Sequence, residues 1–403
     1  MEGESAGQSL WFVFAGGGTG GHLFPALSVA QALRDRAASV DVSFCCTLRP
    51  IDKEVLASAG VEAIPLTVLP LTMKPWRWPR FWLRWRESVA LCRRMFERRR
   101  PAAVIGAGGY ASGPPVHAAL RMGIPTFLLN PDAVPGRANR YLAGRPGLTG
   151  VFAQWAVTRK YLPSDAPFEV TGCPVRLAFR AARGADRRAV LESFGLGPTL
   201  RTLLVTGASQ GARSINEAFA LLAGRLDWTG WQILHLAGQA DAPRMAEAYA
   251  TLAGRSGPAV PKTRVLPFTD RMGEAMAVAD LIVSRAGAST LAEIQAAGKP
   301  CILLPYPYHR DQHQRHNAMV LVEAGAAELV EDAKDGAFNA DRLEPVLREL
   351  MADDGRRERM GRLAMTLDRP GSAEAIAVRL LAAAGACDFC ASGPVKTASR
   401  RIA

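Results

Sequence analysis

A run of apolar residues followed by a glycine-rich turn and an Ala/Leu-rich helix pattern occurs twice in this sequence. The first copy, WFVFAGGGTGGHLFPAL, begins at Trp11, and the second, TLLVTGASQGARSINEAF, begins at Thr202. Other short apolar runs alternate with helix patterns along both halves, which is typical of parallel α/β sheets. A chain of 403 residues is also too long for one compact core. The sequence therefore predicts two α/β domains in series, facing each other across a cleft, with ligands at the carboxyl ends of the strands.

The predicted boundary between these domains lies near the stretch EVTGCPVR, Glu169 to Arg176. We expect a Rossmann-like amino-terminal domain over 1–172, a Rossmann-like carboxy-terminal domain over 173–368, a helix over 369–385 that packs back on the first domain, and a flexible tail over 386–403. The tail holds Cys387 and Cys390. A single CxxC without a second pair favours an incidental role over a metal site.

The composition excludes several classes of protein. The first ten residues contain two acids and no basic cluster, so we expect no cleavable secretory signal. No apolar stretch approaches the ~20 residues needed to span a bilayer. The seven scattered cysteines suit a reducing compartment better than a disulfide framework.

The first glycine-rich turn fits two familiar phosphate-binding patterns, but its neighbours argue against both. A P-loop requires Lys and then Ser or Thr after the last glycine, where this chain has His22 and Leu23. A dinucleotide fold requires an acid at the end of the second strand, but that strand ends FCCT and Asp41 lies at its beginning. What remains is a diphosphate bound by backbone N–H groups at a helix amino terminus, or simply a tight turn. His22 lies in the first helical turn, where the helix dipole favours a neutral imidazole able to accept a proton, although a single histidine is more often structural.

Other segments carry residues suited to a sugar nucleotide. GAGGYASGPP is a second glycine-rich loop on the same rim, so the two loops together suggest one long phosphate-bearing ligand. GASQGARSIN places Ser209 and Gln210 at a helix start, again suited to phosphate oxygens. Glu293 either completes a capping box with Thr290 or accepts hydrogen bonds from a ribose diol. The amides of DQHQRHNA would need partners such as sugar hydroxyls if they were buried.

Much of the net charge of +12 lies in one aromatic segment, Met73 to Arg100. This segment also holds four of the eight tryptophans, namely Trp76, Trp78, Trp82 and Trp85. Arginine interleaved with tryptophan favours contact with an anionic membrane interface, and these four residues are the predicted anchors. A nucleic-acid surface and a helix that packs its aromatics into the core are the alternatives.

Six motifs occur in one order: GGGTGGH, GGYASGP, ASQGAR, SRAGAST with its Glu, LLPYP and HQxxNA. Together they resemble the MurG family of peptidoglycan N-acetylglucosaminyltransferases, in glycosyltransferase family 28, and the likeness extends from Trp11 to about Ala384. The resemblance implies a GT-B fold, which is two facing Rossmann-like domains with parallel sheets and a deep interdomain cleft. It also implies an inverting transfer of N-acetylglucosamine from UDP-GlcNAc to the C4 hydroxyl of the muramoyl group of lipid I. The product would be lipid II, used in peptidoglycan synthesis, cell shape and cell division.

The resemblance also implies roles for particular residues. For the donor it implies Glu293 at the ribose, Phe268 and Thr269 beside uracil, Asn317 and the Ala288 backbone at the sugar, Thr19, Ser209 and Gln314 near the diphosphate, and Gly20, Arg176 and Gln210 elsewhere in the donor site. For the acceptor diphosphate it implies the glycine loops, represented by Gly17, Gly18, Gly21, Gly108, Gly109 and Ser112. For activity it implies His22, our candidate general base, and Tyr110.

One segment departs from the family pattern. Where the family reads HEQNAVPG, this chain has LNPDAVPG, Leu129 to Gly136, so that Asn130, Pro131 and Asp132 occupy the acidic, glutamine and asparagine positions. Asp132 either replaces the family acid, or that acid is dispensable here or supplied from elsewhere.

The implied partners are UDP-GlcNAc, undecaprenyl-linked lipid I and an anionic membrane surface, with cell-wall synthesis and division proteins as further candidates and no nucleic acid. The implied location is peripheral, at the cytoplasmic face of the cell inner membrane. We expect no obligatory cofactor or metal, because the sequence has no DxD pair and backbone N–H groups could stabilise the leaving diphosphate. The alternatives are another GT-B enzyme, such as a diacylglycerol glycosyltransferase or a UDP-GlcNAc 2-epimerase, and a catalytically silent binder of membranes or nucleic acid.

Overall fold

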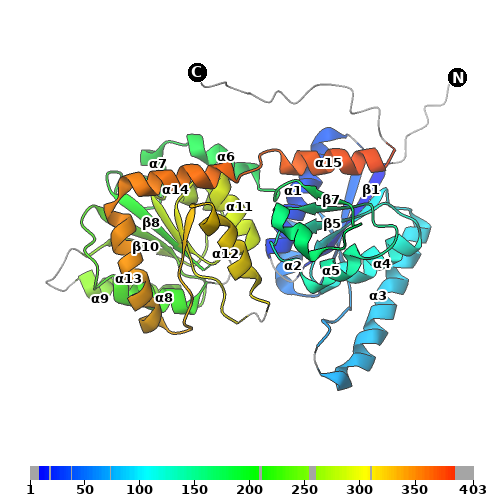
Figure 1. Ribbon diagram of the computed structural model, residues 1–403, viewed down its shortest axis with the longest axis horizontal. Helices are drawn as coiled ribbons and strands as arrows, with labels where there is room; N and C mark the ends of the chain where they lie inside the picture. Colours follow the sequence, from blue (N-terminus) through cyan, green and yellow to red (C-terminus); the bar gives the residue numbers. More distant parts are fainter. Residues whose placement is uncertain are drawn as a thin grey trace.

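The computed structural model describes residues 9–17, 20–37, 39–72, 74–207, 211–253, 260–308 and 311–385. These residues form two lobes, each built on a parallel sheet with helices on both faces (Figure 1). The prediction of two Rossmann-like domains in series is confirmed. The predicted tail over 386–403, with Cys387 and Cys390, lies outside the described residues.

The first sheet has seven strands. In spatial order they are β3 (Glu62–Pro65), β2 (Val40–Cys46), β1 (Leu10–Gly16), β4 (Ala103–Gly108), β5 (Thr126–Asn130), β6 (Gly150–Ala153) and β7 (Phe168–Val170), and each pairs in parallel with its neighbours. The chain order reverses between β1 and β4. In doubly wound sheets ligands bind beyond the carboxyl ends of the strands at such a point. Both predicted glycine loops of this domain begin there.

The second sheet repeats this order with six parallel strands. They are β10 (Lys262–Leu266), β9 (Trp231–Leu236), β8 (Arg201–Thr206), β11 (Leu281–Ser284), β12 (Cys301–Leu303) and β13 (Ala327–Leu329). Its order reverses between β8 and β11. Gly207 and Arg285, which follow these two strands, therefore lie at the corresponding position of the second domain.

Helices bury both faces of each sheet. Those of the first domain are α1 (Gly20–Arg36), α2 (Pro50–Ser58), α3 (Trp78–Arg98), α4 (Gly113–Arg121) and α5 (Arg137–Ala143), with short 3₁₀ turns η1 (Pro75–Arg77), η2 (Tyr110–Ser112) and η3 (Ala156–Tyr161). Those that follow are α6 (Leu177–Ala181), η4 (Ala182–Gly184), α7 (Arg187–Ser193), α8 (Arg213–Leu222), α9 (Ala242–Ala253), α10 (Met272–Val278), α11 (Ala288–Ala297), α12 (His313–Glu323), α13 (Gly336–Ala352), α14 (Asp354–Thr366) and α15 (Ser372–Ala383). Alternate side chains of β1 enter two cores, Phe12 and Phe14 with α1 and α15, and Val13 and Ala15 with α3 and α4. Burial on both faces explains why the strands read as continuous apolar runs.

The chain crosses between the domains twice, at adjacent places. It leaves the first domain after β7 and returns between α14 and α15. The Ser372 hydroxyl donates to the Gly172 carbonyl oxygen (3.0 Å), and Gly172 packs against Arg369. Ile376 and Leu380 of α15 are buried in the core of the first domain. Helix α15 packs beside α1 there (Figure 1). The crossings form a hinge beside the interdomain cleft.

Candidate active site

The two glycine-rich loops of the first domain lie against each other. Gly16 at the end of β1 pairs with Gly108 at the end of β4. A Cβ at Gly109 would come within 2.9 Å of the Gly17 carbonyl oxygen, and one at Gly108, where φ is +104°, would lie 3.0 Å from Cδ2 of His22. Only glycine allows this close approach in such a backbone conformation. The loops therefore meet around the imidazole of His22.

His22 lies in the first turn of α1. Burial lowers the pKa of its imidazole, whereas the charge of Asp132, a backbone hydrogen bond with Gly17 and the charge of Asp52 act in the opposite direction. The net lowering leaves the ring mostly neutral near pH 7. A neutral imidazole in a cleft, with carboxylates near enough to stabilise its charged form, is suited to accept a proton.

Asp52 was missed by sequence reasoning. Its buried carboxylate accepts hydrogen bonds from the Thr47 N–H (3.2 Å) and hydroxyl (2.5 Å), just after β2. A side chain at Gly17 would collide with this carboxylate. Asp52 therefore lies directly beneath the first glycine loop. Its position depends on how α2 folds back on Thr47, which the residue pattern alone did not reveal.

The remaining predicted residues of these loops differ in their surroundings. Gly20 and Gly21 begin α1, and Gly18 and Thr19 lie outside the described residues. Tyr110 packs against the core on the α3 and α4 side of the sheet. Ser112 is buried, and its hydroxyl donates to the Gly109 carbonyl oxygen (2.7 Å). Ser112 therefore stabilises the loop from within, and its predicted part in the acceptor diphosphate site stays a prediction.

The departing segment LNPD is joined to the second domain by Asn317. Asn317 Nδ2 donates to Asp132 Oδ1 (2.8 Å) and to the Ala286 carbonyl oxygen (3.3 Å). Asn317 Oδ1 accepts from the Ala133 N–H (2.8 Å). The side chain is completely buried. In this structure Asn317 makes an interdomain contact, and the sugar contact that the family resemblance implied stays a prediction.

Asn130 also serves the fold. Its Nδ2 donates to the Asp132 carbonyl oxygen (2.6 Å), and its Oδ1 accepts from Asn139 Nδ2 (3.2 Å). Of the three replaced positions, Asp132 alone carries a charge, and that charge acts on His22. Asp132 is therefore the candidate replacement for the family acid.

Arg176 and Glu293 meet where the two domains join. Arg176 Nη2 lies 3.7 Å from Glu293 Oε1, and the guanidinium lies over the ring of Phe24 on α1, 4.8 Å from its centre. Burial raises the pKa of Glu293 to about 7, although Arg176 opposes this. Gly287 is the N-cap of α11, whereas a capping box would require Thr290 there, so that interpretation of Glu293 is wrong. The carboxyl is instead a partly buried group in the cleft.

The amino terminus of α11 adds a second feature suited to an anion. Ala288 is its first residue, no side chain caps this end, and its first turn contains no acid. Helix α11 contacts α1 of the other domain. Backbone N–H groups and the helix dipole favour negative charge at such an end. With Arg176 nearby in the same cleft, this region can bind a phosphorylated ligand.

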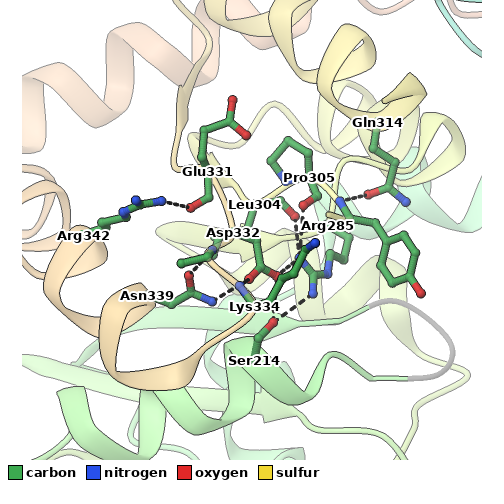
Figure 2. Close-up of polar contacts among 12 residues, drawn as sticks. Ser214, Arg285, Leu304, Pro305, Gln314, Glu331, Asp332, Lys334, Asn339 and Arg342 are labelled. Carbon is green, nitrogen blue, oxygen red and sulfur yellow. Dashed lines mark hydrogen bonds and ion pairs between the residues drawn. The ribbon is translucent and has the colours of Figure 1, made fainter. Parts of the chain in front are cut away.

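A buried ion pair supports the loop after β12, and sequence reasoning missed it as well. Arg285 Nη1 lies 2.5 Å from Asp332 Oδ2 and donates to the carbonyl oxygens of Leu304 (3.0 Å) and Pro305 (3.3 Å) (Figure 2). The Ser214 hydroxyl donates to the same Asp332 oxygen (2.7 Å). Arg285 lies within the SRAGAST motif, and its partner lies 47 residues further on. The network fixes the backbone of the loop that leads to α12.

Gln314 holds that loop from its other side. Its Oε1 accepts from the Tyr306 N–H (2.9 Å), next to the Pro305 carbonyl that Arg285 binds (Figure 2). The predicted contact of Gln314 with the diphosphate stays a prediction. Ser209 and Gln210 lie outside the described residues.

Phe268 and Thr269 line a pocket of about 470 Å³ after β10. The Phe268 ring is exposed, and Thr269 is buried, with its hydroxyl accepting from the Arg271 N–H (3.1 Å). The guanidinium of Arg271 covers the ring of Phe194 in the same pocket, 4.7 Å from its centre. An exposed aromatic face is suited to contact a planar base.

The four predicted membrane anchors divide into two groups. Three are exposed, at 72%, 46% and 54% for Trp76, Trp78 and Trp82. Trp76 lies in η1, and the other two lie at the amino-terminal end of α3, the end that projects from the lobe (Figure 1). Trp85 instead packs on α4, in edge contact with His117, and a Cβ at Gly113 would lie 2.6 Å from its ring. The core-packing alternative therefore holds for Trp85, and the other three remain candidate anchors.

Two features are absent from the part of the chain that the structure describes. Within it, no group of three or more His, Cys, Asp or Glu side chains is arranged to hold a metal ion. None of its helices is both long and apolar enough to cross a membrane.

Comparison with known proteins gives the same family over most of the chain. Residues 12–148 match the glycosyltransferase family 28 N-terminal domain, and residues 202–375 match the glycosyltransferase family 28 C-terminal domain. A protein from Chlorobaculum tepidum is 36% identical over 92% of this chain and 98% of its own length. One from Leifsonia xyli is 36% identical over 91% and 97%. Both are named UDP-N-acetylglucosamine--N-acetylmuramyl-(pentapeptide) pyrophosphoryl-undecaprenol N-acetylglucosamine transferase.

Solved structures support the fold. The crystal structure of Acinetobacter baumannii MurG has a TM-score of 0.71 and 23% identity, covering 93% of this chain and 99% of that one. A UDP co-structure of MnaA from S. aureus has a TM-score of 0.63 and 15% identity, covering 96% and 99%. These likenesses confirm the predicted GT-B architecture.

Proposed function

The chain belongs to glycosyltransferase family 28, and we propose that it transfers N-acetylglucosamine from UDP-GlcNAc to the C4 hydroxyl of the N-acetylmuramyl group of lipid I. The observation that carries this proposal is that the relatives are named as such transferases and that the cleft holds residues suited to this reaction. On one side of the cleft, the glycine loops surround His22 beside Asp132. On the other, Arg176 and Glu293 lie near the uncapped amino terminus of α11.

The proposed reaction is a single inverting displacement. The C4 hydroxyl oxygen attacks the anomeric carbon, the bond from that carbon to the diphosphate oxygen breaks, and UDP leaves with the bonding pair. His22 accepts the hydroxyl proton, and Asp132 favours the imidazolium that results. Arg176 and the first N–H groups of α11 stabilise the charge that grows on the diphosphate. The product carries a new β-1,4 bond.

The test is incubation of the protein with labelled UDP-GlcNAc and a short-chain lipid I analogue, followed by identification of the product. We expect a disaccharide lipid and free UDP. Transfer to diacylglycerol in place of lipid I, or conversion of UDP-GlcNAc without an acceptor, would contradict the proposal and favour a lipid glycosyltransferase or an epimerase. Absence of any donor turnover would favour the silent binder.

Replacing Glu293 by glutamine is expected to weaken UDP-GlcNAc binding by about 1–3 kcal/mol, because a charged hydrogen-bond acceptor is lost. The same change should stabilise the ligand-free protein at alkaline pH. The folded-state pKa of about 7 lies above the ordinary 4.5, so wild-type stability falls as pH rises between these values. That loss is on the order of 3 kcal/mol, and the variant lacks it. Calorimetry with UDP-GlcNAc and unfolding curves at pH 5 and pH 8 measure the two effects.

Glu192→Gln is the matched control for Glu293, since its carboxylate is exposed at the end of α7 in the same domain. It should change neither donor affinity nor the pH dependence of stability. Unchanged donor binding in Glu293→Gln would remove Glu293 from the donor site.

Replacing Asp132 by asparagine is expected to lower kcat/KM for the acceptor at least about tenfold while the affinity for UDP is retained. The asparagine oxygen can still accept the bond from Asn317, so the interdomain contact is kept. Because the charge of Asp132 raises the pKa of His22, its removal should shift the acidic limb of the pH–rate profile to lower pH. A profile that does not move would show that Asp132 does not act on the base.

We also propose that the protein acts peripherally at the cytoplasmic face of the membrane that holds its acceptor, with the exposed end of α3 as the contact. Replacing Trp76 and Trp82 by serine should weaken binding to anionic vesicles about tenfold, because tryptophan favours the headgroup region. Vesicle cosedimentation at low and high salt measures this. Activity on a soluble short-chain acceptor should be retained.

Trp85→Ser is the matched control for the membrane contact, since its ring packs on α4. It should lower thermal stability rather than vesicle affinity at a temperature where it is folded. Unchanged vesicle binding by the folded Trp76 and Trp82 double variant would place the membrane contact elsewhere.

A further inference from the structure

A cavity of about 680 Å³ lies on the hinge side of the cleft and is separate from the residues assigned above to the donor. Its walls come from both domains: the segment after β6, helix α12, and the connection between α14 and α15. Ala133 and His316 also line it, each one residue away from a partner in the Asp132–Asn317 contact. The cavity therefore adjoins the candidate reaction centre.

Two buried polar side chains in its wall have no hydrogen-bond partner among the described residues. Gln154 is 4% exposed, and both its Nε2 and its Oε1 are unpaired. Trp155 is 7% exposed, and its Nε1 is unpaired. Buried polar groups are nearly always satisfied, because an unpaired one destabilises the fold. Three such atoms on consecutive residues that line one cavity indicate a site that a polar ligand completes.

The pattern of these atoms specifies the chemistry of the ligand. A carboxamide with both atoms unpaired matches a peptide unit, since Nε2 can donate to a peptide carbonyl while Oε1 accepts from a peptide N–H. The indole N–H of Trp155 can donate to a second carbonyl or to a carboxylate. Lys160 and Arg369 line the same cavity and suit carboxylates, and Glu323 suits an ammonium group. The site fits a short peptide with charged side chains or ends.

The acceptor named for the relatives carries such a peptide, since their name includes a pentapeptide on the N-acetylmuramyl group. A muramyl group bears its peptide through the lactyl ether on C3, next to the C4 hydroxyl that reacts. We infer that the hinge-side cavity binds the peptide of the acceptor, with Gln154 and Trp155 pairing with its backbone. This inference rests on the proposed function, because it takes the muramyl group to lie beside His22 and Asp132.

The test compares two soluble acceptors, one with the pentapeptide and one in which the lactyl group ends in a methylamide. Gln154→Leu in the full chain should raise KM about tenfold for the peptide-bearing acceptor, the scale of two neutral hydrogen bonds. KM for the truncated acceptor and for UDP-GlcNAc should be unchanged.

Gln295→Leu is the matched control, because it also removes a buried glutamine with an unpaired Nε2, but one outside the cavity. It should affect neither acceptor. Equal KM values for the two acceptors in the wild type, or equal losses in Gln154→Leu, would overturn the inference and leave the cavity to water.

A binding measurement separates this inference from the proposed function. Calorimetry with free N-acetylmuramyl pentapeptide should show binding that Trp155→Phe weakens, a variant that keeps the ring and loses only the N–H. N-acetylmuramic acid alone is the reference ligand. If the protein transfers no sugar yet binds the pentapeptide through Trp155, the proposed function fails and the site stands. If it transfers sugar to both acceptors alike and shows no peptide binding, the site fails and the proposed function stands.

Discussion

Replacing His22 by alanine is expected to lower kcat about 10²- to 10⁴-fold, with the dissociation constant for UDP-GlcNAc changed less than about threefold. General-base assistance contributes on that scale in the transition state and adds little to ground-state binding of the donor. The imidazole lies where the two glycine loops meet, and burial keeps it mostly neutral at pH 7. Single-turnover kinetics with saturating donor, together with calorimetry of donor binding, measure the two quantities separately.

Two further variants test whether the effect belongs to the base itself. His117→Ala removes another histidine of the first domain, one that contacts Trp85 on the other face of the sheet, and should leave turnover unchanged. Gly108→Ala adds a methyl group 3.0 Å from the His22 ring in a backbone conformation that disfavours side chains. It should lower turnover by displacing the imidazole. If His22→Ala reduced donor binding and turnover equally, His22 would be a positioning residue.

The fold could be predicted from local patterns because its strands are buried on both faces. The apolar runs that begin at Trp11 and Thr202 became β1 and β8, and the glycine turns after β1 and β4 lie side by side. These features depend on residues close in sequence and on a general property of parallel sheets. The strand order then follows from the short connections of a doubly wound fold.

The parts of the site that were missed depend on distant contacts. The capping-box alternative for Glu293 required only local spacing, but the helix begins at Ala288, and the carboxyl lies beside Arg176 where the domains join. Asn317 has the expected position in its motif, yet the altered LNPD segment supplies Asp132 as its partner. Neither partner could be assigned without knowing how the two domains face each other.

The amphipathic segment illustrates a different limit. Its spacing puts Trp78, Trp82 and Trp85 on one side of an ideal helix, so they were expected to share one environment. The supporting helix α4 reaches Trp85 but not the projecting end of α3, so Trp85 is packed and Trp82 is 54% exposed. The spacing of the residues predicts which side of the helix they share. How many of them are buried depends on how far the neighbouring helix extends along that side.

Replacing Arg285 by methionine is expected to lower the free energy of unfolding by about 3–5 kcal/mol, the cost of leaving a buried charge without its partner. The side chains of Arg285 and Asp332 are 8% and 0% exposed. Burial acts to raise the pKa of Asp332, but hydrogen bonds from Asn339 and Ser214 and the charge of Arg285 outweigh it, so the pKa is lowered. Unfolding by urea at pH 7.5 measures the loss. Arg93→Met, which breaks an exposed ion pair within α3, is the matched control and should cost less than about 1 kcal/mol.

The pH dependence of Arg285→Met separates a lost charge partner from a simple packing defect. In the wild type the lowered pKa of Asp332 contributes stability above the unfolded pKa, and this contribution is lost as pH falls. Without Arg285 one of the interactions that lower the pKa of Asp332 is lost, so this pKa rises above its wild-type value and the variant should recover stability relative to the wild type as the pH is lowered toward it. Adding Asp332→Leu should restore part of the loss at pH 7.5, because an apolar pair can replace a buried ion pair. If the loss of stability does not change with pH and Asp332→Leu does not reduce it, Arg285 acts only through its hydrogen bonds to the Leu304 and Pro305 carbonyls. In either case the loop that Gln314 holds should loosen, so KM for UDP-GlcNAc should rise as well.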